Sequence, residues 1–197
     1  MDYMDLGENL PKPQSKVNKS EPDKYPTVAV LTISDRSAQG LRKDLSGPAV
    51  VQSIHKLTGW NCTKIEIVSD DTTEISAKLC GWADEDKFNL IITTGGTGMS
   101  IRDVTPEATL AVIEREAPGI MEAVRSASLL ITPYAMLSRA VAGIRGRSLI
   151  INLPGNPKAV NEALTVLAAA LPHALDLISD QHNSSQQHSR KPDIDPE

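Results

Sequence analysis

Four short apolar runs, each followed by small polar residues or glycine, most strongly constrain how this chain can fold. They are TVAVLTIS at 27–34, CTKIEIV at 62–68, FNLIIT at 88–93 and SLIINL at 148–153. Between them lie segments whose apolar residues recur at helical spacing. Because apolar strands that alternate with helices build a mainly parallel sheet covered on both faces, the sequence predicts an α/β fold of this kind.

Start and stop signals place the helices between these runs. Gly59 follows a helical pattern and predicts its C-terminal end, since glycine readily adopts the left-handed conformation found there. Thr105, with Pro106 behind it, predicts an N-cap followed by proline in the first turn. Asn156, followed by Pro157, repeats this signal at the start of a helix rich in alanine and leucine.

The folded region is predicted to be one domain over residues 26–180. The chain has 197 residues, enough for one well-buried core but hardly for two. Apolar residues form 40% of the chain and aromatic residues only 3%, so the core must consist of Val, Ile, Leu and Ala. Residues 1–25 and 181–197 are polar, and we expect both to be disordered tails.

Charge, hydropathy and cysteine spacing exclude several classes of protein. The net charge of −5 argues against a general nucleic-acid binder, which usually has a basic surplus. No apolar run approaches the roughly 20 residues of a transmembrane helix, and the N-terminus lacks the apolar stretch of a secretory signal. Cys62 and Cys80 lack metal-ligand spacing and are expected to be reduced thiols. The sequence therefore predicts a soluble cytoplasmic protein that binds neither nucleic acid nor membranes.

Small polar residues and glycines follow all four predicted strands. The strand ends contain Ser34 with Asp35, Asp70 with Asp71, Thr94 with Gly95, and Pro154 with Gly155 and Asn156. The carboxyl ends of parallel strands lie at one edge of a sheet, and ligands bind outside that edge in folds of this class. We therefore expect these residues to form a ligand site.

The glycine-rich segment TTGGTGMSIRD at 93–103 is the most distinctive part of this edge. Glycines let the backbone approach a ligand closely, and successive N–H groups can then cradle a phosphate. The residues that would do so are Thr94, Gly95, Gly96, Thr97 and Gly98. The segment has neither the lysine of a P-loop nor the third glycine of a dinucleotide-binding loop. A tight strand-to-helix turn without a ligand stays open as an alternative.

A carboxylate that follows the glycines points to a metal ion. Asp103 would repel a phosphate unless a cation lay between them, and Mg2+ favours one or two carboxylates together with phosphate oxygens. Asp70, at the neighbouring strand end, can supply the second carboxylate. The alternative is that Asp103 only caps the turn and Asp70 the next helix.

Several motifs in a fixed order resemble those of a known enzyme family. They are LIITTGGTGMSIRD, then VTPEAT, TPYAMLSRAVAGIRG at 132–146 and INLPGNPKAV at 151–160. Together they are similar to the molybdenum-cofactor biosynthesis superfamily, and within it to the molybdopterin adenylyltransferases such as bacterial MogA and the G domain of gephyrin. The resemblance spans about residues 27–180. It implies a homotrimer whose subunit is a three-layer α/β/α sandwich with a mainly parallel central sheet.

The resemblance also implies a reaction. Members of this family transfer AMP from Mg-ATP to the terminal phosphate of molybdopterin, release pyrophosphate, and pass the product to a molybdenum-insertion protein. ATP and molybdopterin would then be the substrates, Mg2+ the cofactor, and the insertion protein a downstream partner. The family's essential aspartate falls on Asp103 and the second metal carboxylate on Asp70, with the adjacent Asp71 as an alternative register.

Further site residues are implied by the same motifs. The positions at the nucleotide side are Ser34 and Asp35. The positions at the pocket for the pterin's phosphate are Ser138, Arg139, Pro154, Gly155 and Asn156. Three other interpretations stay open: a MoaB-type molybdopterin-binding protein, the related metal-insertion domain, and a non-catalytic trimeric scaffold.

Overall fold

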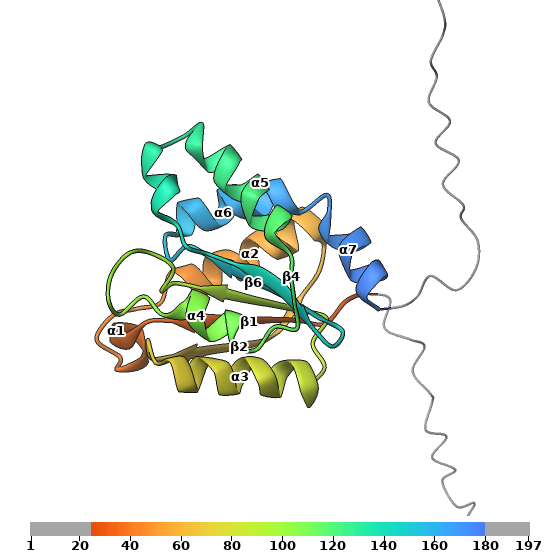
Figure 1. Cartoon of the computed structure of the whole chain (residues 1–197), viewed down its shortest axis with the longest axis horizontal. Coiled ribbons are helices and arrows are strands. Elements are labelled where there is room, and N and C mark those ends of the chain that lie inside the picture. The colour runs from red at the N-terminus through yellow and green to blue at the C-terminus, as the bar shows by residue number, and fades with distance from the viewer. Residues whose placement is uncertain (1–24, 180–197) are drawn as a thin grey trace, which may run out of the picture.

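A six-stranded sheet forms the middle of the structure, and helices pack on both of its faces (Figure 1). The computed structural model describes residues 25–179. The two predicted disordered tails lie outside these residues, apart from Tyr25. Within the described part of the chain, no helix is long and apolar enough to cross a bilayer.

Four parallel strands bring the predicted strand ends to one edge. The order across the sheet is β2 (Cys62–Val68), β1 (Val28–Ile33), β3 (Leu90–Thr94), β6 (Ser148–Leu153), β5 (Ala142–Arg145) and β4 (Arg115–Glu116). The first four strands are parallel, whereas β5 and β4 are antiparallel to their neighbours. Thr94 pairs with Thr32 on one side and with Leu153 on the other, so the ends of β1, β3 and β6 are level.

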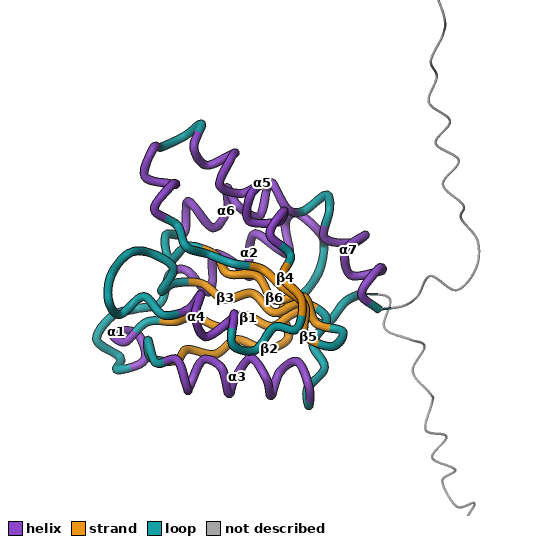
Figure 2. Tube along the Cα trace, in the orientation of Figure 1, coloured by secondary structure: helices purple, strands orange, loops and turns teal. Residues whose placement is uncertain are grey.

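The helices form the two outer layers (Figure 2). One layer contains α2 (Ser46–Thr58), α5 (Pro118–Leu129), α6 (Pro157–Leu167) and α7 (Leu171–Ile178), and the other contains α3 (Thr72–Asp84) and α4 (Thr105–Leu110). Two short helical segments, α1 (Asp35–Ala38) and η1 (Pro133–Leu137), lie in the connections. The predicted three-layer α/β/α arrangement is confirmed.

Side-chain alternation along the central strands builds a core on each face of the sheet. Val28 and Val30 of β1 join one buried cluster with residues of α2 and α6. Ala29 and Leu31, which alternate with these valines along the strand, join a second cluster with residues of α3. All four side chains have no exposed surface, which explains why the strand is apolar without interruption.

Local helix signals were reliable at two of three positions. Gly59 ends α2 in the left-handed conformation, with φ at +76°, and Asn156 caps α6 by accepting a hydrogen bond from the amide of Lys158 at 2.9 Å. The prediction of Thr105 as an N-cap is wrong, because Val104 is the cap and Thr105 is the first helical residue. The Thr105 hydroxyl donates instead to the carbonyl of Gly95 at 2.9 Å, so a contact with the glycine segment replaces local capping.

A buried asparagine in β6 connects the sheet to α4. The side-chain amide of Asn152 donates to the hydroxyls of Thr93 and Thr109, both at 2.9 Å, and its carbonyl accepts from the amide of Val141 at 3.2 Å. Asn152 is fully buried. Because buried polar groups are costly when unpaired, this network favours one position of α4 on the sheet.

Removal of this network should destabilise the fold. Asn152→Ala leaves two hydroxyls and one amide without their partner, and we expect it to lower the free energy of unfolding by about 2–4 kcal/mol. Urea unfolding followed by circular dichroism measures the change. Asn61→Ala, at an exposed position, is the control and should change stability by less than about 0.5 kcal/mol. Equal stability of the two variants would contradict the assigned role of Asn152.

Candidate active site

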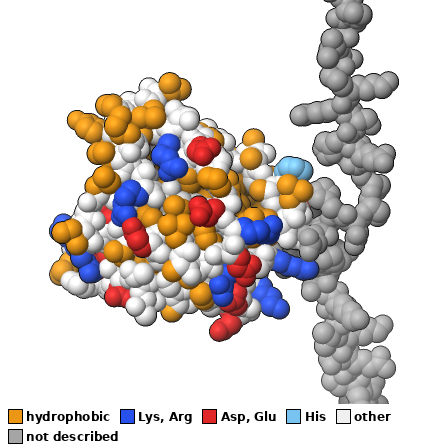
Figure 3. All heavy atoms as spheres, viewed as in Figure 1, with side chains coloured by type: hydrophobic (Ala, Val, Ile, Leu, Met, Phe, Trp, Pro, Cys, Tyr) orange, Lys and Arg blue, Asp and Glu red, His pale blue; other side chains and the backbone are white. Residues whose placement is uncertain are grey.

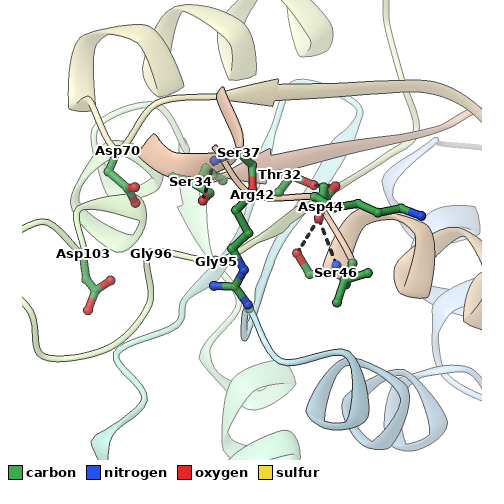
Figure 4. Close-up of a pocket in the computed structure, with 14 residues that line it drawn as sticks. Thr32, Ser34, Ser37, Arg42, Asp44, Ser46, Asp70, Gly95, Gly96 and Asp103 are labelled. Carbon is green, nitrogen blue, oxygen red and sulfur yellow. Dashed lines mark hydrogen bonds between the residues drawn. The ribbon is translucent and has the colours of Figure 1, made fainter. Parts of the chain in front are cut away.

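A polar cavity of about 230 Å³ opens at the predicted edge of the sheet (Figure 4). Its walls come from the end of β1, the connection between α1 and α2, the end of β2, the residues after β3 and the turn after β6. The predicted site residues that line it are Ser34, Asp70, Gly95, Gly96, Asp103 and Gly155. The strand-end prediction therefore located a cavity that brings together residues from four separate segments.

The glycine loop, which we define as residues 95–103, begins with two glycines in the left-handed region. Gly95 has φ at +100° and Gly96 at +62°. A Cβ atom on Gly95 would lie 2.3 Å from the carbonyl oxygen of Ile33, and one on Gly96 would lie 2.4 Å from the hydroxyl of Thr105. The loop can fold back against β1 only because neither position carries a side chain.

Three successive amides of this loop are available to a ligand. The amide of Gly95 donates to the carbonyl of Leu153 at 3.1 Å, so it is already used. The amides of Gly96, Thr97 and Gly98 have no acceptor among the described residues. Consecutive backbone N–H groups of this kind bind phosphate oxygens in many proteins.

Asp70 and Asp103 both line the polar cavity, as does Gly96 (Figure 4). Each uses one carboxylate oxygen to accept from a backbone amide. Asp70 accepts from Asp35 at 2.7 Å, and Asp103 accepts from Ser100 at 2.8 Å. The second oxygen of each carboxylate has no donor in the part of the chain that the structure describes, and is thus available to a cation.

The two carboxylates fit a divalent metal ion. Burial raises the pKa of Asp70 above its ordinary value, and the charges of Asp35 and Asp103 raise it further. A cation between Asp70 and Asp103 would offset this unfavourable charge, and Mg2+ accepts one or two carboxylates together with phosphate oxygens and water. Residues 25–179 contain no group of three or more His, Cys, Asp or Glu side chains that could hold a metal. A bound substrate would have to supply the remaining ligands.

Asp35 orients Asp70 and is itself held by Arg102. The amide of Asp35 donates to the Asp70 carboxylate at 2.7 Å, and the amide of Asp70 donates to the Asp35 carboxylate at 3.0 Å. Arg102 donates to Asp35 through Nε at 3.0 Å and through Nη2 at 2.8 Å. The hydrogen bonds from Arg102 are the main cause that lowers the pKa of Asp35. Asp35 was expected at the nucleotide side, and its carboxylate instead faces Arg102.

One guanidinium holds the middle and the C-terminal end of the glycine loop. Arg139 donates through Nε to the carbonyl of Gly98 at 2.7 Å, and through its other nitrogens to the carbonyl of Asp103 and the carboxylate of Glu107. Its backbone amide donates to the carbonyl of Thr97 at 2.9 Å. The resemblance placed Arg139 at a phosphate pocket, whereas here the side chain holds the loop that would bind the phosphate.

A second, mostly apolar cavity of about 290 Å³ borders the glycine loop on its other side. Thr97 and Gly98 line it, together with residues of α5, η1 and α6. Ser138 and Pro154, which were predicted as site residues, line it as well. Because Gly155 lines the polar cavity and Pro154 the apolar one, this turn and the glycine loop separate the two cavities.

Three other predicted residues have structural partners outside both cavities. The Thr94 hydroxyl donates to the carbonyl of Pro154 at 2.7 Å, and Asn156 caps α6. Asp71 caps α3 by accepting from the amide of Glu74 at 2.9 Å. Of the two adjacent aspartates after β2, Asp70 therefore faces the polar cavity.

The connection between α1 and α2 contributes Asp44, a residue of the cavity lining that the sequence analysis did not name. The Asp44 carboxylate accepts from the hydroxyl of Thr32 at 2.7 Å and from the amide of Ser46 at 2.9 Å, so it connects the first turn of α2 to β1. An aspartate two residues before Ser46 is a helix-capping signal that could have identified it. Arg42 and Lys43 also line the cavity, and Arg42 extends toward the glycine loop (Figure 4).

Comparison with known proteins agrees with the resemblance. Residues 29–173 match the family described as a probable molybdopterin binding domain. Molybdopterin adenylyltransferase of Helicobacter pylori is 44% identical over 152 residues, which cover 77% of this chain and 86% of that protein. The crystal structure of the molybdopterin biosynthesis enzyme MoaB from Thermus thermophilus matches with a TM-score of 0.75 and 42% identity, and the match covers 79% of this chain and 98% of that one.

A longer relative matches over the same region. Gephyrin of Dictyostelium discoideum is 43% identical over 173 residues, which cover 83% of this chain. This chain spans only 24% of gephyrin, so the similarity concerns one part of that protein.

The role of Arg139 can be tested by a substitution that keeps its charge. Arg139→Lys cannot reach three acceptors at once, because an ammonium group lacks the planar fork of a guanidinium. We expect the free energy of unfolding to fall by about 1–3 kcal/mol, and the glycine-loop amides to exchange hydrogen about tenfold faster. Hydrogen-exchange mass spectrometry of residues 95–103 measures the second effect. Arg147→Lys, at an exposed position, is the control, and unchanged exchange in Arg139→Lys would refute the role.

Proposed function

We propose that this chain, which belongs to the family of molybdopterin-binding domains of molybdenum cofactor biosynthesis, transfers the adenylyl group of Mg-ATP to the terminal phosphate of molybdopterin. An oxygen of that phosphate attacks the α-phosphorus of ATP, and the bond from this phosphorus to the bridging oxygen of the β-phosphate breaks. Pyrophosphate leaves, and adenylylated molybdopterin remains. Relatives named molybdopterin adenylyltransferase at 43–44% identity support this activity.

The observation that carries the proposal is one glycine loop that lines two cavities. Gly96 lines the polar cavity and Thr97 the apolar cavity, and the amides of both have no acceptor among residues 25–179. ATP in the polar cavity and molybdopterin in the apolar cavity would thus bring their phosphates to the same loop. This arrangement suits a transfer between two phosphorylated substrates better than it suits hydrolysis of one.

Positioning and electrostatics would supply most of the catalysis. The attacking phosphate is already anionic at neutral pH, so no serine or cysteine nucleophile needs activation. The loop amides would hold phosphate oxygens while charge builds up between the two anions. Arg42 and Lys43, on the wall of the polar cavity, would attract the pyrophosphate that leaves.

Asp70 and Asp103 would hold the magnesium ion that accompanies ATP. When bound, the ion neutralises negative charge on the phosphates. The chain presets both ligands for it: Asp35 fixes one oxygen of Asp70, and Arg139 holds the backbone of Asp103. Neither carboxylate would then need to reorganise when substrate arrives.

The metal role of Asp103 gives a direct test. Asp103→Asn keeps an acceptor for the amide of Ser100 but loses the negative charge, and we expect adenylyl transfer to fall about 100-fold or more. Pyrophosphate release from Mg-ATP and molybdopterin measures the rate. Asp176→Asn, on the exposed side of α7, is the control and should keep the normal rate.

Two outcomes would contradict this function. Near-normal transfer by Asp103→Asn would remove the metal role from Asp103. A wild-type protein that binds molybdopterin without releasing pyrophosphate would favour the second candidate, a MoaB-type binding protein, for which the similarity to the Thermus thermophilus structure is the supporting observation.

The protein would act in the cytoplasm as a homotrimer that passes its product to a molybdenum-insertion protein. An apolar tip where α5 joins η1 supports self-association (Figure 3). Its exposed residues are Leu129, Leu130, Ile131, Tyr134 and Met136. Leu130 is 91% exposed in the single chain, which is unusual for leucine in a protein that stays monomeric.

Light scattering tests this association. We expect a particle three times the mass of the chain, and we expect Leu130→Asp to shift it toward the monomer because a charge would be buried at the contact. Leu177→Asp, on α7, is the control and should keep the larger mass. A monomeric wild-type protein would contradict the trimer, and a trimeric Leu130→Asp variant would place the interface elsewhere.

A further inference from the structure

Among residues 25–179, Glu162 is the one acidic residue that lines the apolar cavity. It lies on α6, between Ala159 and Ala163 of the same wall. The one basic residue of the lining, Arg125, donates to the carbonyl of Ala140 at 2.8 Å and does not pair with Glu162. A carboxylate in a mostly apolar wall is unfavourable unless a ligand offers it hydrogen-bond donors.

The hydrogen-bonding capacity of Glu162 is unused by the described part of the chain. No donor there forms a hydrogen bond with its carboxylate, and its only ion pair is a contact of 3.8 Å with Lys158. The Lys158 side chain is 80% exposed, whereas that of Glu162 is 26% exposed. An exposed pair of this length contributes little, so Glu162 is not held in place as a structural ion pair.

The helix that carries Glu162 is rigidly placed. Val160, Ala163 and Leu164 of α6 are buried in the core, and Asn156 caps the start of the helix. The carboxylate therefore projects from a fixed element and could recognise a ligand by its shape. Thr97 and Gly98 line the same cavity, so a ligand that contacts Glu162 could extend to the glycine loop.

A carboxylate binds best to the edge of a ring that presents two adjacent N–H donors. A 2-amino-4-oxopyrimidine ring, as in a pterin, presents two adjacent N–H donors, from the 2-amino group and from N3. A carboxylate can accept both with parallel hydrogen bonds, as it does from a guanidinium. The apolar wall suits the flat faces of the rings, and the volume of about 290 Å³ is close to the lower end of ligand-binding cavities.

We propose that Glu162 recognises the pterin of the substrate by accepting hydrogen bonds from its 2-amino group and N3–H. The proposal rests on the proposed function, since it takes molybdopterin as the substrate. It gives Glu162 a role in specificity and none in the transfer itself. The terminal phosphate would lie at the glycine loop while the pterin edge is read at α6.

A pair of ligands that differ at one position tests this role. The probes are 6-hydroxymethylpterin phosphate and the matching lumazine, in which a carbonyl replaces the 2-amino group. Isothermal titration with the full-length wild-type chain should show a preference for the pterin of about tenfold or more, the range expected of a bidentate contact. Glu162→Gln should reverse the preference, because its amide can donate to the carbonyl of lumazine and accept from N3–H.

Glu122→Gln, on the exposed side of α5, is the control and should keep the wild-type preference. Circular dichroism and unfolding midpoints establish that all variants are folded. The proposal is overturned if the wild type binds neither probe, if it binds both equally, or if Glu162→Gln keeps the wild-type ratio.

A kinetic measurement separates this proposal from the proposed function. In an active enzyme, Glu162→Gln should raise the KM for molybdopterin about tenfold or more and leave the KM for ATP unchanged. An active wild type with an unchanged KM for molybdopterin in the variant refutes the role of Glu162 alone. Absence of pyrophosphate release by the wild type refutes the transferase function, while the titration still decides whether Glu162 reads the pterin edge.

Discussion

The backbone of Gly95 and Gly96 is the constraint on which the rest of the site depends. Their positive φ angles turn the chain back against β1, where a side chain on Gly95 would collide with the carbonyl of Ile33. Only this turn places unpaired loop amides beside Asp70 and Asp103. Amides that attract anions and carboxylates that repel them are compatible when a metal ion and phosphates arrive together. This loop geometry is therefore compatible with the metal–nucleotide complex that the proposed function requires.

Arginines stabilise this geometry without occupying the place of the substrate. Arg139 directs its donors to loop carbonyls and Glu107, and Arg102 directs its donors to Asp35. Both guanidinium groups therefore bind protein atoms, and the hydrogen bonds of Arg139 hold the glycine loop in place without a ligand. Dipoles that are fixed in advance stabilise developing charge more effectively than groups that must move into position. Arg42 and Lys43 line the polar cavity from the α1–α2 connection, and in the proposed reaction they would be the cations that attract the leaving pyrophosphate.

The strands and the position of the polar cavity could be predicted from sequence, because both depend on the pattern of neighbouring residues along the chain. Apolar runs identify β1, β3 and β6, and the alternation of CTKIEIV identifies β2 as a half-buried strand. The polar residues after these four strands identify the edge that forms the polar cavity. The partner of a long side chain is set by the tertiary fold: Arg139 is separated by 41 positions from Gly98, whose carbonyl it binds. Asp35 follows a strand as expected, yet its carboxylate serves Arg102 because the loop returns over it. The strand β4 has two residues, too few for an alternation to be recognised.

A transfer between two phosphates requires binding energy that lies away from the phosphates. The two anions repel each other, and contacts at the reacting groups alone cannot tell one phosphate ester from another. Binding of each substrate's remote part in its own cavity can offset the repulsion and bring the reacting atoms together. The separation of the two cavities by the glycine loop and the Pro154–Gly155 turn matches this requirement. Substrate selectivity would then depend on the parts of each cavity that lie away from the glycine loop. The rate of transfer would depend on the loop, where the two cavities meet.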